Sequence, residues 1–117
     1  MADYPQQGEF WWANFQEGWE RPALVVSRNE LNRGRLVLVV PCTSSSVQER
    51  AVYSNHVLLP HGSGGLTNDT IAQTHLIQPI ETNCLERKIG VLNHEQLAEV
   101  LLAIAWTIDL FDTTNLP

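Results

Sequence analysis

The chain has 117 residues, of which 44% are apolar and 17% charged, and its net charge at neutral pH is −6. This length supports one domain with one hydrophobic core and is too short for two ordinary domains. The sequence has no apolar run long enough for a membrane-spanning helix, and its acidic start does not resemble a secretory signal. Two cysteines give no disulfide framework, so we expect free thiols and a cytoplasmic protein.

The charges are unevenly spread along the chain. All seven basic residues lie before residue 93 together with nine of the thirteen acids, which gives this part 7 − 9 = −2. The last 25 residues hold the other four acids and no lysine or arginine, hence −4. The main body is therefore nearly neutral. Such a composition permits a local basic groove for a nucleic acid but does not by itself indicate one.

Short apolar segments between turn residues predict a mainly β fold. They are rich in β-branched and aromatic residues, as strands are. The predicted strands cover residues 8–15, 22–28, 35–42, 51–59, 70–80 and 87–92. The segment 35–42 is apolar throughout, which is typical of a central strand buried on both faces. Residues 1–7 are polar, so we expect a flexible N-terminal tail followed by a single domain over residues 8–117.

The C-terminal segment predicts an amphipathic helix. Asn93 is a suitable N-cap, Gln96 follows three residues later as in a capping box, and Leu92 with Leu97 forms a hydrophobic staple. One apolar stripe consists of Leu97, Leu101, Ile104, Ile108 and Phe111, and a second of Leu102, Trp106 and Leu110. Two apolar faces need two partners, so we expect one to cover the sheet and the other to meet a second chain. Strands followed by one helix predict a strongly curved β-barrel with a terminal helix.

Several common catalytic and cofactor motifs are missing from the sequence. It contains no GxGxxG or P-loop pattern and no GxSxG nucleophile elbow. Its four histidines lack an HExxH or CxxC context, so we expect no metal and no cofactor. His56, His61 and His94 are predicted at the surface.

An arginine and a run of hydroxyls form the one candidate anion site. Arg21 begins the second predicted strand, and Thr43 begins the hydroxyl run 43–46 at the end of the third. If these strands pair antiparallel, both residues fall at the same end of the sheet. A guanidinium binds a phosphate through two hydrogen bonds, and hydroxyls add neutral donors.

The segments around these residues resemble the N-terminal motifs of the MazF/PemK toxins. The resemblance rests on Gly8–Trp11, Arg21–Ser27 and Val40–Ser44, and continues through Gly65–Ile71, Ile89–Leu92 and the final helix. It covers roughly residues 8 to 112. The RPALVVS segment followed by P-x-TS at this spacing is more specific than either piece alone.

This resemblance implies an SH3-like barrel, usually homodimeric, that cuts single-stranded RNA at short motifs without a metal. It also implies an antitoxin partner that silences the toxin. The family's catalytic arginine and threonine match Arg21 and Thr43. The expected reaction is attack of the ribose 2′-hydroxyl on the adjacent phosphate, which requires a base, an acid and cationic stabilisation. We expect Arg21 to stabilise the charge and Thr43 to hold the phosphate, with Ser44 and Ser45 as further contacts.

The sequence departs from the family in two places. Many members have a longer loop between the first two strands, where this chain has only QEGWE. Glu17, Trp19 and Glu20 are therefore the candidate substrate contacts in this loop. Trp19 has two interpretations: it stacks on an extruded base, or it covers the end of the barrel as a hydrophobic lid.

The second departure concerns the segment 73–78. Family members often have an acidic residue where this chain has His75. His75 is either a base with a pKa near neutrality or a partly buried structural histidine. Gln73, on the same predicted strand face, is a candidate substrate contact.

Two other functions remain open at this point. Toxins with this barrel also act by binding a protein such as DNA gyrase through the end of the C-terminal helix, and Trp106 fits such a role. The changed loop and His75 also fit a catalytically weakened homologue. The presence of both Arg21 and Thr43 favours the nuclease.

Overall fold

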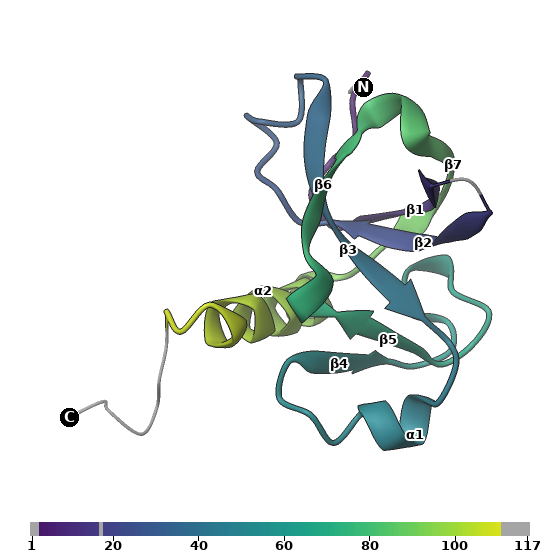
Figure 1. Ribbon diagram of the computed structural model, residues 1–117, viewed down its shortest axis with the longest axis vertical. Helices are drawn as coiled ribbons and strands as arrows, with labels where there is room; N and C mark the ends of the chain where they lie inside the picture. The colour runs from purple at the N-terminus through teal and green to yellow at the C-terminus, as the bar shows by residue number, and fades with distance from the viewer. Residues whose placement is uncertain (1–2, 17, 111–117) are drawn as a thin grey trace.

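A computed structural model describes residues 3–16 and 18–110 (Figure 1). The strands are β1 (Glu9–Gln16), β2 (Trp19–Val25), β3 (Leu36–Thr43), β4 (His56–Leu59), β5 (Thr70–Gln73), β6 (Gln78–Glu81) and β7 (Leu85–Val91). The helices are α1 (Val47–Arg50) and α2 (His94–Thr107), with single 3-10 turns η1 (Ser63–Gly65), η2 (Thr74–Leu76) and η3 (Thr82–Cys84). Within these residues, no helix is long and apolar enough to cross a membrane.

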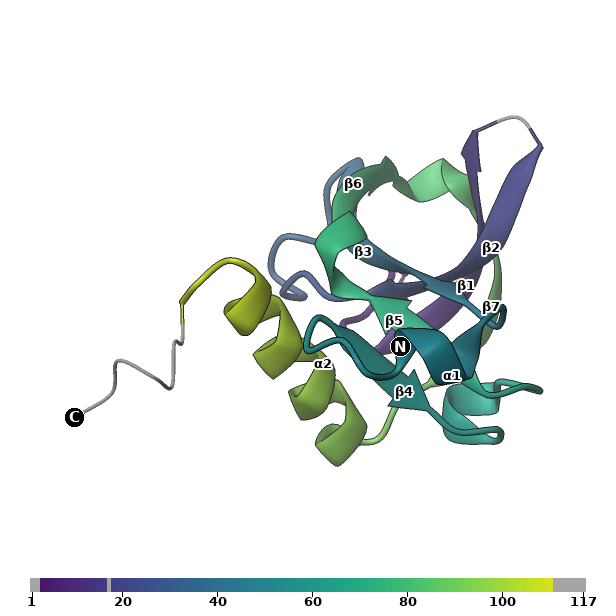
Figure 2. The ribbon, with the colours of Figure 1, turned by 60° about the horizontal axis from the view of Figure 1, so that its bottom comes forward.

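The strands form one antiparallel sheet that curls strongly on itself (Figure 2). Its strand order is β4-β5-β3-β2-β1-β7, and β6 pairs with β3 beside this path. No pairing between β4 and β7 is found in the described part of the chain, so the barrel is not closed by hydrogen bonds. The predicted class, mainly β with a C-terminal helix and an SH3-like barrel, is confirmed.

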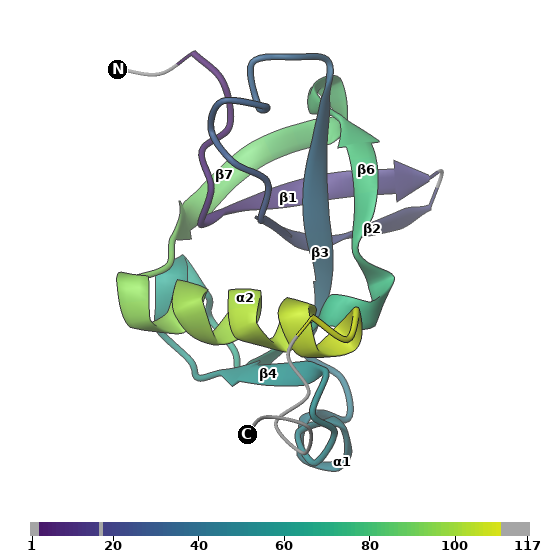
Figure 3. The same ribbon diagram turned by 90° about the vertical axis from the view of Figure 1, so that its left-hand side faces the viewer.

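The curled sheet separates two hydrophobic clusters. Successive side chains in a strand point to opposite faces, so Phe10 and Leu24 join one cluster while Ala13 and Ala23 join the other. The first cluster includes Val100 of α2, which runs across the end of β3 and packs beside β4 (Figure 3). The helix therefore covers the face of the sheet that carries the first cluster and does not contribute to the second cluster.

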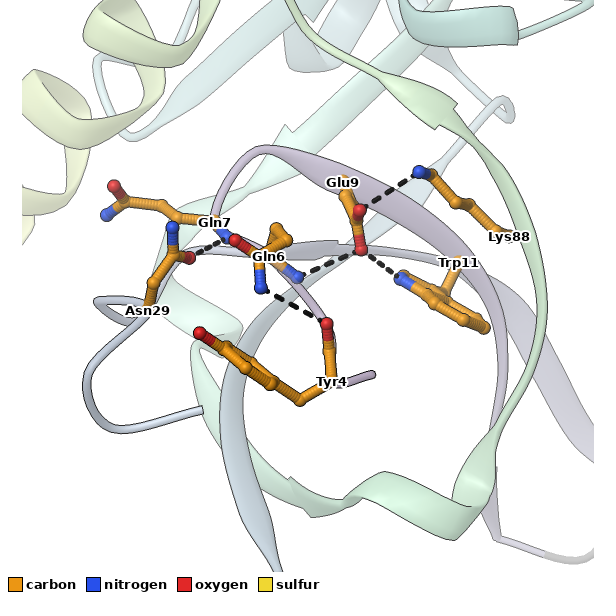
Figure 4. Close-up of polar contacts among 7 residues, drawn as sticks. All are labelled: Tyr4, Gln6, Gln7, Glu9, Trp11, Asn29 and Lys88. Carbon is orange, nitrogen blue, oxygen red and sulfur yellow. Dashed lines mark hydrogen bonds and ion pairs between the residues drawn. The ribbon is translucent and has the colours of Figure 1, made fainter. Parts of the chain in front are cut away.

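Residues 3–7, expected as a flexible tail, are held against the domain (Figure 4). The backbone N–H of Gln7 donates to Asn29 Oδ1 at 2.7 Å, and the backbone N–H of Gln6 donates to Glu9 Oε1 at 2.9 Å. Glu9 is buried, and its other oxygen lies 3.0 Å from Lys88 Nζ. These contacts attach the N-terminal segment to the start of β1.

The start of α2 follows the prediction closely. Asn93 Oδ1 accepts a hydrogen bond from the backbone N–H of Gln96 at 2.8 Å, which confirms the N-cap. The Gln96 side chain bonds to Ser63 Oγ rather than back to residue 93, so the reciprocal half of the capping box is absent among these contacts. Leu92 and Leu97 both pack in the first cluster, as the staple requires.

The end of α2 differs from the prediction. The helix ends at Thr107, so Ile108 is exposed instead of facing the core, and Phe111 lies outside the described residues. The second stripe is exposed as expected: Leu102, Trp106 and Leu110 are at least half accessible to solvent.

The predicted strand 51–59 is wrong in its first half. Only β4 pairs with β5, while a turn closed by a backbone hydrogen bond from His56 N to Tyr53 O follows α1. Local turn hydrogen bonds compete with sheet pairing here, and the β-branched Val52 stays exposed.

The predicted strand 70–80 is interrupted at η2. The hydroxyl of Thr74 donates to the carbonyl of Asn55 at 2.6 Å and also lies 2.8 Å from Thr107 Oγ1. These tertiary bonds turn the backbone between β5 and β6. His75 therefore lies in a 3-10 turn and not on a strand.

The strand β3 is buried on both faces only in its second half. Val39 to Cys42 are inaccessible, but Leu36 and Leu38 are more than a third exposed. The first half of β3 pairs with the edge strand β6, where no layer covers the outer face. The expectation of complete burial over 35–42 is corrected accordingly.

Candidate active site

The strands β2 and β3 part at the end of the sheet. Ala23 pairs with Pro41, and the same register continued by two residues sets Arg21 opposite Thr43. On its other edge β3 pairs with β5, where Thr43 lies opposite Ile71. The pairing of β2 with β3 ends at Ala23 and Pro41, so Arg21 and Thr43 lie just beyond its last pair, where the two strands part.

A cavity of about 470 Å³ occupies this opening. Its walls come from β1, β2, the end of β3, the loop before β5, and β7. They are formed by Trp12, Glu20, Arg21, Pro22, Cys42, Thr43, Ser44, Gly65, Leu66, Thr67, Asn68, Thr70, Arg87 and Ile89. The expected meeting of Arg21 with the hydroxyl run is thus present in the structure.

The guanidinium of Arg21 is supported by an aromatic pair. Its Cζ lies 4.6 Å from the ring centroid of Trp19, and that ring packs against Phe15 at 4.9 Å. Arg21 Nε is buried and has no hydrogen-bond partner among the described residues. A buried N–H of this kind favours an added acceptor, and a phosphate oxygen suits a guanidinium well.

The hydroxyl of Thr43 is held by the loop that follows it. Thr43 Oγ1 accepts a hydrogen bond from the backbone N–H of Ser45 at 3.2 Å and lies 3.1 Å from Ser45 Oγ. The carbonyl of Ser45 in turn accepts from Arg50 Nε at 3.1 Å. Ser44 lines the cavity, whereas Ser45, also predicted as a substrate contact, lies behind Thr43 and positions it.

A second cation reaches the cavity from β7. Arg87 pairs with Trp12 of β1, and Trp12 pairs with Pro22 of β2. Directly paired residues point to the same face, so these three side chains form one row along the wall. Arg87 and Arg21 make the cavity suitable for an anion with more than one phosphate group.

Glu20 is the one carboxylate among the described residues that line the cavity. A hydrogen bond with Glu20 raises the pKa of the neighbouring Glu86 carboxyl, since two adjacent carboxylates favour a shared proton. Glu86 itself is not among the residues that line the cavity.

The thiol of Cys42 also lines the cavity, but it is not a nucleophile. Burial raises the pKa of this thiol to about 12, even though Arg21 lies near enough to lower it. It therefore stays neutral at physiological pH. In the described ranges, no three of the His, Cys, Asp and Glu side chains lie close enough together to hold a metal ion.

His75 lies apart from this cavity. It lines a separate hollow of about 420 Å³ with Tyr53, Asn55, His56, Trp106 and Thr107. Its Nδ1 accepts a hydrogen bond from Asn55 Nδ2 at 2.7 Å, and its ring lies 5.4 Å from that of His56. Burial lowers the pKa of His75, and the nearby His56 and Arg50 lower it further.

The other substrate contacts predicted from the sequence lie in different places. Gln73 is buried in β5 with Oε1 unpartnered in the described structure, and it does not line the cavity. Trp19 belongs to β2 and stacks on the guanidinium of Arg21. Its two interpretations from the sequence, stacking on a base and covering the end of the barrel, stay predictions. Glu17 lies outside the described residues.

Trp12, Asn68 and Arg87 are among the cavity residues that could not be found from the sequence. Trp12 and Arg87 reach the site because β7 pairs with β1, and no local pattern gives that pairing. Asn68 follows the glycine-rich segment 61–65, which carries no catalytic motif. The short polar stretch between Leu66 and Thr70 was the available signal for a second loop at the site.

Comparison with known proteins agrees with this geometry. A family model described as "PemK-like, MazF-like toxin of type II toxin-antitoxin system" matches residues 6–108. The chain belongs to this family. The match includes both Arg21 and Thr43.

Two curated relatives come from Mycobacterium tuberculosis. Endoribonuclease MazF9 is 33% identical over 118 residues, with 91% of this chain and 98% of the relative covered. Probable endoribonuclease MazF5 is 28% identical over 110 residues, with 93% and 97% covered.

Solved structures share the fold. An endoribonuclease in complex with its cognate antitoxin, from Mycobacterial species, superposes with a TM-score of 0.79 at 20% identity, covering 92% of this chain and 98% of that one. A MazE–MazF structure from Deinococcus radiodurans gives a TM-score of 0.73 at 24% identity, covering 92% and 97%.

Proposed function

We propose that this protein is an endoribonuclease toxin that cleaves single-stranded RNA in the cytoplasm. The observation that carries the proposal is the placement of Arg21 and Thr43 on the two sides of one polar cavity. The family match and the relatives named as endoribonucleases support the same reaction. An open cavity with two arginines suits a flexible strand with successive phosphates.

In this mechanism the ribose 2′-hydroxyl attacks the adjacent phosphorus and the 5′-oxygen leaves. The products are a cyclic phosphate and a free 5′-hydroxyl. Arg21 stabilises the charge that builds up on the phosphoryl oxygens. Thr43, fixed through Ser45, donates its hydroxyl hydrogen to the same phosphate.

Proton transfer in this proposal belongs to Glu20. The reaction needs a group that accepts the 2′-hydroxyl proton, and Glu20 is the carboxylate at the cavity wall. The departing 5′-oxygen takes a proton from water to become the 5′-hydroxyl, and Glu20 returns its proton to the solvent after the products leave. His75 takes no part in this scheme, because it lines the other hollow.

The partners follow from family and surface together. An antitoxin that covers the Arg21 cavity would silence the protein by competing with RNA, and two of the similar solved structures are toxin–antitoxin complexes. The exposed face of α2, with Leu102 and Trp106, is the proposed homodimer surface, since large apolar side chains are rarely left together in water.

Cleavage by the Thr43→Val variant tests the proposal. This change removes one hydrogen-bond donor from the phosphate site while keeping the side-chain volume, so the rate should fall about 10²- to 10³-fold. A folded Thr43→Val protein that cuts RNA at the wild-type rate would overturn the assignment. A folded wild-type protein that cuts no RNA would favour the alternative of a binding toxin on this fold.

A further inference from the structure

The loop between β4 and β5 is fixed rigidly beside the cavity. Its turn η1 packs against β7 (Figure 3), and backbone contacts hold it there. A Cβ atom added at Gly90 would lie 2.2 Å from the carbonyl oxygen of Gly64, and one added at Gly65 would lie 2.6 Å from the carbonyl oxygen of Ile89. Such distances are possible only without side chains, so the glycines let the two backbones meet directly.

Further bonds fix the rest of this loop. Gln96 of α2 donates to Ser63 Oγ at 2.8 Å, and the backbone N–H of His61 donates to Asp69 Oδ1 at 2.8 Å. Leu66 is buried in the first hydrophobic cluster. The glycine-rich segment 61–65 and the residues that follow it are therefore anchored at several points.

This anchoring presents two exposed side chains to the cavity. Thr67 and Asn68 stand between the buried residues Leu66 and Thr70, and all four line the cavity wall. The hydroxyl of Thr70 donates to the carbonyl of Asn68 at 2.9 Å, which fixes the backbone at that residue. Asn68 therefore faces the same space as Arg21.

The chemistry of Asn68 differs from that of the other polar groups in the cavity. Among the described residues, it is the one side-chain amide in the lining, beside arginines, hydroxyls, one carboxylate, one indole and one thiol. Arginines and hydroxyls suit phosphate, but an amide offers a donor and an acceptor side by side, which suits the edge of a base. Thr67 Oγ1 takes one Asn68 amide hydrogen at 3.4 Å and leaves the oxygen and the second hydrogen free.

We propose that Asn68 reads an adenine next to the cleaved phosphate, and that Gly90 positions the loop for this contact. The free amide oxygen would accept from the adenine 6-amino group, and the free amide hydrogen would be donated to N7. Single-stranded RNA exposes this edge of the base. The inference rests on the proposed ribonuclease function and adds the base that the site selects.

Cleavage of a randomised RNA pool tests the contact, with cut sites mapped for wild type, Asn68→Ala and Asn68→Asp. Wild type should cut beside adenine. Asn68→Ala should reduce that preference about 5- to 150-fold, which is the discrimination that two hydrogen bonds from one side chain to one base provide. Asn68→Asp removes the donor and should disfavour adenine relative to cytosine, whose amino group suits a carboxylate. Asn83→Ala, at an exposed turn away from the cavity, is the matched control.

The positioning role of Gly90 has its own pair of variants. Gly90→Ala should relax base preference and lower kcat/KM together, whereas Gly34→Ala, whose Cβ meets nothing nearer than 3.7 Å, should change neither. If Gly90→Ala fails to fold, the Asn68 variants still decide the proposal.

Binding of a 2′-deoxy oligonucleotide pool measures base recognition without cleavage, because strands that lack the 2′-hydroxyl cannot be cut. Adenine-dependent binding that Asn68→Ala abolishes would support the contact even if wild type cut no RNA. Cleavage by wild type and Asn68→Ala at the same sites would overturn the contact while leaving the ribonuclease intact. Absence of both cleavage and adenine-dependent binding would overturn both.

Discussion

The guanidinium of Arg21 lies over the ring of Trp19, with 4.6 Å between Cζ and the ring centroid. The two residues are two positions apart on β2, so their side chains leave the strand on the same face. Stacking holds the guanidinium without using its N–H groups, which stay available to a phosphate. Trp19 thus acts on the site by holding the guanidinium of Arg21.

Removing this support should slow the reaction. Trp19→Ala is expected to lower kcat by about 2- to 30-fold, the range of a cation–π contact, with a smaller effect on KM. Trp19→Phe should recover most of the rate because it restores an aromatic face. Single-turnover cleavage kinetics measure both, with Tyr53→Ala as a control on the other hollow. Equal rates for wild type and Trp19→Ala would remove the role assigned to the stack.

Loss of the cavity carboxylate should affect chemistry more than binding. Glu20→Gln keeps the size of the side chain but cannot accept the 2′-hydroxyl proton, so kcat should fall about 10²- to 10⁴-fold. Affinity for a 2′-deoxy strand should stay near that of wild type. Glu99→Gln on α2 is the control, and a Glu20→Gln enzyme with wild-type kcat would exclude this base.

The buried carboxylate of Glu9 should matter for stability and not for catalysis. It accepts hydrogen bonds from the backbone N–H of Gln6 and from Trp11 Nε1, at 2.9 and 3.0 Å, and pairs with Lys88. Glu9→Ala leaves these donors without their acceptor and should lower the free energy of unfolding by about 2 kcal/mol. Urea denaturation measures the change, and the exposed Glu81→Ala should lose far less. A Glu9→Ala protein as stable as wild type would contradict the role of this network.

The hollow at His75 predicts a pH dependence of stability. The pKa of His75 is lowered in the folded protein, by burial first and then by His56 and Arg50, so the unfolded chain binds this proton more readily. Its contribution is complete above the ordinary histidine pKa of about 6.5 and is lost as the pH falls below it. His75→Asn should therefore flatten the decline of Tm as the pH falls below about 6.5.

The same variant tests the catalytic alternative for His75. Because His75 does not line the Arg21 cavity, His75→Asn should leave the acidic limb of the pH–rate profile unchanged. Disappearance of that limb in the variant would restore the histidine to the mechanism.

Local patterns predicted the elements whose stability is local. The cap at Asn93 and the stripe members Leu97, Leu101 and Ile104 depend on spacing within one helix, and they appear in the structure. The predicted stripe member Ile108 lies past the end of the helix and is exposed. The segment 51–59 failed in its first half because a local turn, closed by His56 N and Tyr53 O, took the place of the strand. The segment 70–80 failed because hydrogen bonds between distant residues, such as Thr74 to Asn55, interrupted it. Apolar content alone does not reveal such bonds.

The same distinction between local and distant contacts applies to the residues of the candidate site. The meeting of Arg21 with Thr43 could be predicted, because it needs only the antiparallel register of consecutive strands. Arg87 could not, since it arrives through the pairing of the first and last strands. Asn68 depends on backbone contact between Gly64 and Gly90, residues far apart in the sequence, so its position required the fold.

The most direct test of the central claim is cleavage of a long unstructured RNA in excess EDTA, followed by mapping of the cut ends. Wild type, Arg21→Ala and Arg28→Ala, an arginine exposed at the surface, are compared at equal folded concentration. The account predicts recurrent cuts with cyclic phosphate and 5′-hydroxyl ends, about 10²- to 10³-fold slower in Arg21→Ala and unchanged in Arg28→Ala. Intact RNA with folded wild type, or equal cutting by Arg21→Ala, would contradict it.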